Sequence, residues 1–223
     1  MKYLVFDTSS IITLAMNSLL PTIKSLTEAY GGQFIIPPEV KKELIDNPLH
    51  SKKYALEAII TLKSIELGYL KVDSRTIRDD LLKLANSIYQ SKSKYMTVVH
   101  KAECDALALA LKIDAEAYVV DERTTRLLVE NPKQLKKLLE NKLHSTITIN
   151  QDNLKKFQNL VRGIKIIRSS ELMAVALEKG LLDKYLPTEI PRKQQVEALM
   201  WALRLNGCAL ATEEIKELVK NIK

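Results

Sequence analysis

Two aspartates follow apolar, strand-like runs at widely separated points of the 223-residue chain. Asp7 comes directly after residues 3–6 and Asp121 directly after residues 117–120, and polar residues that can open a helix follow each of them. Ligands of open parallel sheets bind at the carboxyl ends of the strands. If the two strands are neighbours, the two carboxylates lie roughly 5 Å apart at the backbone. We expect a cation to offset their mutual repulsion.

Three further acids lie on predicted helices and complete the candidate cluster. Glu43 lies within a helix expected at residues 38–45, and Glu103 and Asp105 share a helix expected at residues 100–113. Glu103 and Asp105 are separated by about 200° around the helix axis, so both cannot face one pocket equally well, and periodicity leaves the choice open. Converging carboxylates suit Mg²⁺ or Mn²⁺. Such ions lower the pKa of a water molecule and neutralise charge on phosphoryl oxygens.

The order of the predicted elements indicates the fold class. Apolar β-type runs alternate with helical patterns along the chain, which predicts an α/β protein with a parallel sheet, right-handed crossovers and helices on both faces. Strands are expected at residues 3–6, 33–36, 68–72, 117–120, 146–149 and 164–167. Helices are expected at residues 11–20, 22–30, 38–45, 51–64, 76–89, 100–113, 133–142, 154–161, 170–179, 192–205 and 212–221, and a polar loop at residues 90–94.

The positive charge of the chain is concentrated in one segment. Residues 133–168 contain nine Lys or Arg and two acids, so they carry a charge equal to the net +7 of the whole chain. A polyanionic partner such as RNA is therefore plausible. The expected RNA-binding residues are Lys136, Lys137, Lys155, Lys156 and Arg162. Phe157 is the only Phe, Tyr or Trp of this segment, so little indicates a base-stacking platform.

Other features narrow the class of protein. Cys104 and Cys208 lack metal-ligand spacing and are interpreted as core residues of a reducing compartment. No apolar run approaches the length of a membrane span, so we expect a cytoplasmic protein with no membrane contact. No phosphate-cradling glycine loop is present. Arg123 and Arg126 could hold phosphate, but a solvated helix face is the simpler interpretation.

Four short motifs, in order along the chain, make the sequence resemble the PIN-domain nucleases. They are Val5-Phe6-Asp7-Thr8-Ser9, Glu43 in the helix after the second strand, the run from Ala102 to Ala110, and Val119-Val120-Asp121-Glu122-Arg123. The resemblance covers residues 1–128 well and residues 164–180 more loosely. It implies a three-layer α/β/α sandwich, a Mg²⁺- or Mn²⁺-dependent ribonuclease and a frequent homodimer. Many members of the family are toxins of toxin–antitoxin pairs.

The resemblance also assigns roles to the acids. Glu103 stands where the family has a Gly-Glu-Ala variant of the third motif, and Asp105 stands where it more often has an aspartate. Either Asp121 or Glu122 supplies the fourth acid. The expected catalytic residues are Asp7, Glu43, Asp105 and Asp121, and the expected metal ligands are these four together with Glu103.

The leading hypothesis is an endoribonuclease in which water attacks the phosphorus and no side chain acts as nucleophile. One alternative is a non-catalytic PIN-like module that binds RNA or a protein. Another is a toxin that a small antitoxin-type protein neutralises. We expect residues 1–128 to form the PIN-like core and residues 129–163 to form a basic insertion. Residues 164–223 are expected to add the last core strand and a helical region.

Overall fold

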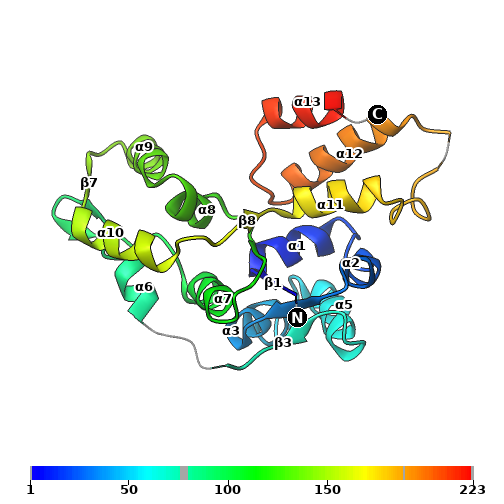
Figure 1. Ribbon diagram of the computed structural model, residues 1–223, viewed down its shortest axis with the longest axis horizontal. Helices are drawn as coiled ribbons and strands as arrows, with labels where there is room; N and C mark the ends of the chain where they lie inside the picture. The colour runs from blue at the N-terminus through cyan, green and yellow to red at the C-terminus, as the bar shows by residue number, and fades with distance from the viewer. Residues whose placement is uncertain (1, 76–79, 188, 222–223) are drawn as a thin grey trace.

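The computed structural model describes residues 2–75, 80–187 and 189–221, and a central sheet of five parallel strands organises them (Figure 1). The order of the strands across this sheet is β3, β2, β1, β6, β8. Their bounds are β1 (Tyr3–Phe6), β2 (Gln33–Ile36), β3 (Lys71–Val72), β6 (Ala117–Val119) and β8 (Ile166–Ile167). The parallel sheet predicted from the alternation of strands and helices is confirmed.

Strands β1 and β6 are neighbours in the middle of this sheet. Phe6 is in register with Val119, and the backbone N–H of Asp7 donates to the carbonyl of Val119 over an N···O distance of 2.9 Å. The residues of both strands are almost entirely apolar and buried, as expected for parallel strands that are covered on both faces. The first and fourth motifs therefore end at the same edge of the sheet.

Helices cover both faces of the central sheet, which gives the expected three-layer sandwich. Helix α1 packs against α5 and α11, whereas α7 packs on β1 and β6. Figure 1 shows α1 and α7 on opposite sides of β1. The helices of this part are α1 (Thr8–Met16), α2 (Thr22–Tyr30), α3 (Pro38–Lys41), the π-helix η1 (Lys42–Asp46), α4 (Asn47–Leu49), α5 (Ala55–Glu66), α6 (Asp80–Ala85), α7 (Lys101–Lys112), α8 (Arg123–Glu130) and α11 (Ser169–Glu178).

A second, antiparallel sheet joins residues 89–95 to residues 147–149, which belong to the positively charged segment 133–168. Strand β4 (Tyr89–Ser91) pairs with β5 (Lys94–Tyr95) and with β7 (Ile147–Ile149). The loop predicted at residues 90–94 is wrong, because Lys92 and Ser93 have φ values of 49° and 63° and form a tight hairpin turn. The strand predicted at residues 146–149 exists as β7 but does not extend the parallel sheet. Helices α9 (Pro132–Leu143) and α10 (Gln151–Leu160) flank it.

The second and third predicted strands are followed by elements that differ from the predictions in type or extent, and the third strand is itself shorter. The helix predicted at residues 38–45 begins as α3 and continues as the π-helix η1, a form of helix that is frequent at functional sites. The third strand covers residues 71–72 alone, because Gly68 turns the chain with a φ of 76°. Of the helix predicted at residues 76–89, residues 76–79 lie outside the described residues, and α6 ends at Ala85.

The carboxy-terminal helices form a layer over α1 (Figure 1). Helix α11 packs on α12 (Arg192–Leu205), which packs on α13 (Thr212–Asn221). The guanidinium of Arg168, just before α11, donates to the carboxylates of Glu171 and Glu214, and this ion pair ties α11 to α13. In the described ranges, no helix is both long enough and apolar enough to cross a membrane.

The packing of α10 yields a stability prediction. Phe157 is completely buried, whereas Leu160 on the same helix is 43% exposed. We expect Phe157→Ala to lower the free energy of unfolding by about 3–5 kcal/mol and Leu160→Ala by roughly 1 kcal/mol or less. Urea denaturation followed by circular dichroism measures both values. Equal small losses for the two variants would contradict the packing of α10 on the core.

Candidate active site

Asp7 lies at the end of β1 and is the N-cap of α1. The residue is only 1% exposed. Oδ2 accepts hydrogen bonds from the backbone N–H of Ser9 at 3.0 Å and from the Ser9 hydroxyl at 2.6 Å. Oδ1 is buried and has no hydrogen-bond partner in the described part of the chain. One oxygen of this carboxylate is therefore held firmly by Ser9, while the other is buried and unpaired among the described residues.

The surroundings of Asp7 disfavour its charged form. Burial raises the pKa of Asp7 to about 7, and the negative charge of Glu103 adds to this effect. The hydrogen bonds from Ser9 act in the opposite direction because they stabilise the carboxylate. A carboxylate that ionises with difficulty in the bare protein is one that a nearby cation would stabilise strongly.

Glu43 is held beside Asp7 by the residue that follows Asp7 in the chain. The hydroxyl of Thr8 donates to Oε2 of Glu43 at 2.7 Å. Glu43 itself lies in η1. This helix follows β2 and α3 in the chain, at the carboxyl end of β2. Glu43, the acid of the second motif, therefore lies close to the carboxyl end of β1.

Of the two acids on α7, the structure brings Glu103 to this edge. Oε1 of Glu103 accepts from the hydroxyl of Thr125 at 2.5 Å, and Oε2 accepts from the backbone N–H of His100 at 2.6 Å. Burial raises the pKa of Glu103, and the charges of Glu122 and Glu43 add to the shift. Glu103 is therefore coupled electrostatically to Asp7, Glu43 and Glu122.

Asp105 lies on a different side of the same helix. Its Oδ2 is 3.7 Å from Nζ of Lys101, one turn earlier, and Nζ of Lys101 also donates to Oε2 of Glu39. The separation of about 200° between the two acids explains why the electrostatic coupling to Asp7 involves Glu103. The choice that periodicity left open is made by the packing of α7 against β6, where the Tyr118 hydroxyl donates to the carbonyl of Glu103.

Asp121 and Glu122 follow β6 and have different surroundings. Asp121 is fully buried, and its two carboxylate oxygens accept from the backbone N–H of Ser169 at 2.8 Å and from the Ser169 hydroxyl at 2.6 Å. Glu122 is the N-cap of α8, where its Oε2 accepts from the backbone N–H of Thr125. Asp121 therefore anchors the first turn of α11, whereas the charge of Glu122 acts on Glu103.

These acids fit a hard divalent cation by donor type and by the unpartnered Oδ1 of Asp7. In the described ranges, however, no three His, Cys, Asp or Glu side chains lie close enough together to hold a metal ion as they stand. Two of the acids are turned toward threonine hydroxyls, Glu43 toward Thr8 and Glu103 toward Thr125. The site thus combines suitable ligands with hydrogen bonds that a metal would have to replace.

The predicted RNA-binding residues lie apart from the parallel sheet, in the α9–β7–α10 region at one end of the molecule (Figure 1). Lys137, Lys155, Lys156 and Arg162 are exposed. Lys136 is half-buried, and its Nζ is 3.5 Å from Oε1 of Glu140. Most of the predicted basic surface is therefore accessible.

Two residues of the site were not identified from the sequence. Thr125 holds Glu103 and Ser169 holds Asp121, and both lie in the first turn of a helix. Small hydroxyl residues at helix starts are common as caps, so their position is a weak signal. Their partners lie 22 and 48 residues away in the chain, and only the assembled sheet reveals them.

The raised pKa of Asp7 predicts a pH-dependent stability. Without metal, the folded chain holds a proton on Asp7 up to about pH 7, whereas the ordinary pKa of an exposed aspartate is 3.8. The contribution of Asp7 to stability is therefore complete at low pH and lost as the pH rises through about 7. In EDTA, we expect the Tm of the wild type to fall by a few degrees more than that of Asp7→Asn between about pH 5 and about pH 8. Parallel pH profiles in thermal denaturation would contradict the raised pKa.

Asp121 is expected to behave differently from Asp7. Asp121→Ala leaves the N–H and hydroxyl of Ser169 without their buried acceptor, so we expect a loss of about 2–3 kcal/mol in the free energy of unfolding. Asp7→Asn removes a carboxylate that is costly to ionise and should not destabilise the metal-free protein at about pH 8. Urea denaturation of both variants in EDTA tests this contrast. An unchanged midpoint for Asp121→Ala would exclude the anchoring role.

Comparison with protein families agrees with this arrangement. A family model described as a PIN domain matches residues 3–136, which is more than half of the chain and contains Asp7, Glu43, Glu103 and Asp121. Searches of curated proteins and of solved structures each gave no match. The resemblance carried by the four motifs is thus confirmed, and the chain belongs to the PIN-domain family.

Proposed function

We propose that this protein is a Mg²⁺- or Mn²⁺-dependent endoribonuclease that hydrolyses RNA phosphodiester bonds at the acidic cluster. One observation carries the proposal. Asp7 is buried with one carboxylate oxygen held by Ser9 and the other without a partner, and it lies within the electrostatic reach of Glu103. Proteins of the PIN-domain family are commonly nucleases, which supports the same chemistry.

The roles of the residues follow from their contacts. When bound, a divalent cation lowers the pKa of a water molecule and neutralises charge on the phosphoryl oxygens. Asp7, Glu43 and Glu103 would hold it, with Glu122 adding negative charge beside them. Ser9 keeps Asp7 in place and also accepts the backbone N–H of Asp121 at 3.0 Å, so one hydroxyl joins the ends of β1 and β6. We assign to Glu103 the ligand role that the sequence left open between it and Asp105.

A second candidate function is a non-catalytic module that binds RNA or a protein. It is favoured by the absence, in the described part of the chain, of three ligand-type side chains that converge on one point. The antitoxin-type partner, the homodimer and the cytoplasmic location expected from the sequence stay predictions.

Cleavage of a structured RNA in Mn²⁺, in Mg²⁺ and in EDTA separates these functions. We expect cleavage with either metal, none in EDTA, and a loss of more than about 100-fold in Asp7→Asn and in Glu103→Gln, because each removes a ligand. Asp105→Asn is the matched control on α7 and should stay within roughly fivefold of the wild type. The loss of intact RNA over time on a denaturing gel gives the cleavage rate of each variant.

Each other outcome has a clear meaning. Cleavage that persists in EDTA and in Asp7→Asn would identify a contaminating nuclease and exclude the mechanism. A loss in Asp105→Asn as large as that in Glu103→Gln would overturn the assignment of Glu103. RNA binding without cleavage under all conditions would support the non-catalytic module.

A further inference from the structure

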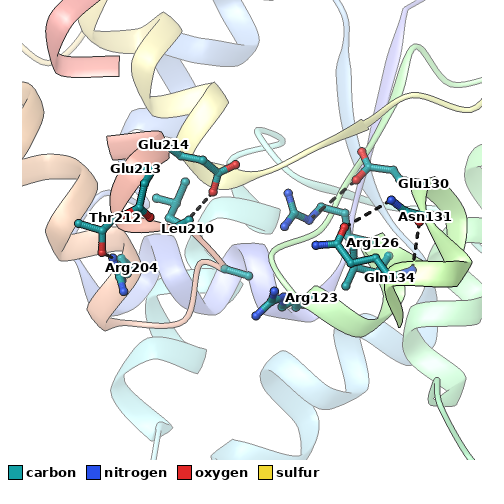
Figure 2. Close-up of a pocket in the computed structure, with 13 residues that line it drawn as sticks. Arg123, Arg126, Glu130, Asn131, Gln134, Arg204, Leu210, Thr212, Glu213 and Glu214 are labelled. Atoms are coloured by element: carbon teal, nitrogen blue, oxygen red, sulfur yellow. Dashed lines mark hydrogen bonds and ion pairs between the residues drawn. The ribbon is translucent and has the colours of Figure 1, made fainter. Parts of the chain in front are cut away.

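We propose that a cavity lined by Arg123, Arg126 and Arg204 binds phosphates of the RNA strand next to the cleavage site. This inference rests on the proposed function, since it takes RNA to be the substrate of the acidic cluster. The cavity has a volume of about 720 Å³, which is within the range of sites that hold nucleotide-sized ligands. Figure 2 shows α8 on one of its sides and the α12–α13 connection on the other.

Helix α8 connects the cavity to the acidic cluster. Its N-cap Glu122 and its residue Thr125 interact with each other and, through charge or hydrogen bond, with Glu103. Arg123 and Arg126 are three residues apart, so they share a face of the helix, and that face lines the cavity. The start of one helix therefore places Glu122 beside the candidate active site and two arginines in the cavity.

The opposite wall of the cavity begins at the strand end that carries Asp121. The backbone N–H of Ala209 donates to the carbonyl of Asp121 at 3.3 Å, and residues 209–214 line the cavity. Arg204, at the end of α12, completes this wall. Since both walls start at the carboxyl end of β6, an RNA strand that leaves the acidic cluster along this edge enters the cavity.

The three guanidinium groups retain donors for an anion. Arg123 is exposed and its side chain forms no ion pair or hydrogen bond with any residue in the described ranges. Nε of Arg126 is buried without a hydrogen bond and lies 4.0 Å from Oε2 of Glu130. Arg204 donates one hydrogen bond, to the hydroxyl of Thr212, and its guanidinium lies 4.8 Å from the ring of Trp201. Guanidinium groups with free donors bind phosphate in a bidentate manner.

Three acids also line the cavity, and two of them face cations. Glu214 accepts from Arg168 at 3.1 Å and from the backbone N–H of Ala211 at 2.7 Å, and Glu130 lies opposite Arg126. Glu213 is the third acid. Among the described residues, Arg123 forms no ion pair with any of these acids or with another one, which makes it the strongest candidate for a phosphate contact.

The positive surface continues beyond the cavity, which favours a polynucleotide over a small phosphate. Gln134 of α9 lines the cavity, and Lys133 and Lys137 on the same helix are exposed. A strand of several nucleotides can contact the arginines and these lysines together. A mononucleotide can contact the arginines alone and should bind more weakly.

Binding of a fluorescent single-stranded oligoribonucleotide, measured by anisotropy, tests the proposal without cleavage. The parent protein for this test is the Asp7→Asn variant. We expect Arg123→Gln and Arg204→Gln each to weaken binding roughly tenfold and to reduce the salt dependence of log K by about 0.7 per lost contact. Lys52→Gln, which removes one charge from an exposed residue away from the cavity, should change the affinity less than about twofold. Adenosine monophosphate should compete only at much higher concentration than unlabelled RNA.

The outcomes separate this inference from the proposed function. Equal losses in Arg123→Gln and Lys52→Gln, or no RNA binding by the parent protein, would overturn the cavity as an RNA site. Unchanged affinity in the arginine variants together with metal-dependent cleavage by the wild type would reject the cavity and retain the nuclease. Loss of binding in the arginine variants without any cleavage by the wild type would retain the cavity and reject the nuclease. Strong competition by adenosine monophosphate would point to a small phosphate ligand and reject the RNA strand.

Arg123 holds no other group of the described residues in place, so its substitution keeps the test independent of folding.

Discussion

The buried carboxylate of Asp7 is the group on which the arrangement of the acidic edge depends. Asp7 ends the central strand β1, so it is surrounded by the neighbouring strands and the helices above and below them. Ser9 satisfies one of its oxygens and accepts the backbone N–H of Asp121 with the same hydroxyl. Thr8 holds Glu43. A short turn after β1 thus organises acids from three separate parts of the chain.

The parallel sheet brings several helix starts to the same edge, and these stabilise the clustered negative charge. Asp7 caps α1, Glu122 caps α8, and Glu103 lies in the first turn of α7. The first turn of α11 supplies the Ser169 N–H to Asp121. The amino end of a helix has unpaired N–H groups and a partial positive charge, which favour carboxylates. This backbone contribution lets the fold tolerate acids that otherwise repel one another.

The part of the chain beyond the PIN-domain match completes this edge. The match ends at residue 136, whereas Ser169 anchors Asp121 and residues 209–214 form a wall of the arginine cavity. Arg168 connects the two, because it donates to Glu214 and to the carbonyl of Ala209. The carboxy-terminal helices therefore belong to the surroundings of the site and are more than an external addition.

The sequence alone determined the fold class, the parallel sheet and the strand ends at Asp7 and Asp121, because apolar runs and helix starts are local signals. It did not reveal the hairpin at residues 89–95, whose apolar content is too low to mark strands. It also left the choice between Glu103 and Asp105 open. Helical periodicity shows which residues share a face of the helix, but it does not show which other element that face contacts. Only the tertiary structure brought the charge of Glu103 near Asp7 and brought Ser169 to Asp121. Such contacts form between elements that are far apart in the chain. A local pattern of residues does not show how those elements pack against one another.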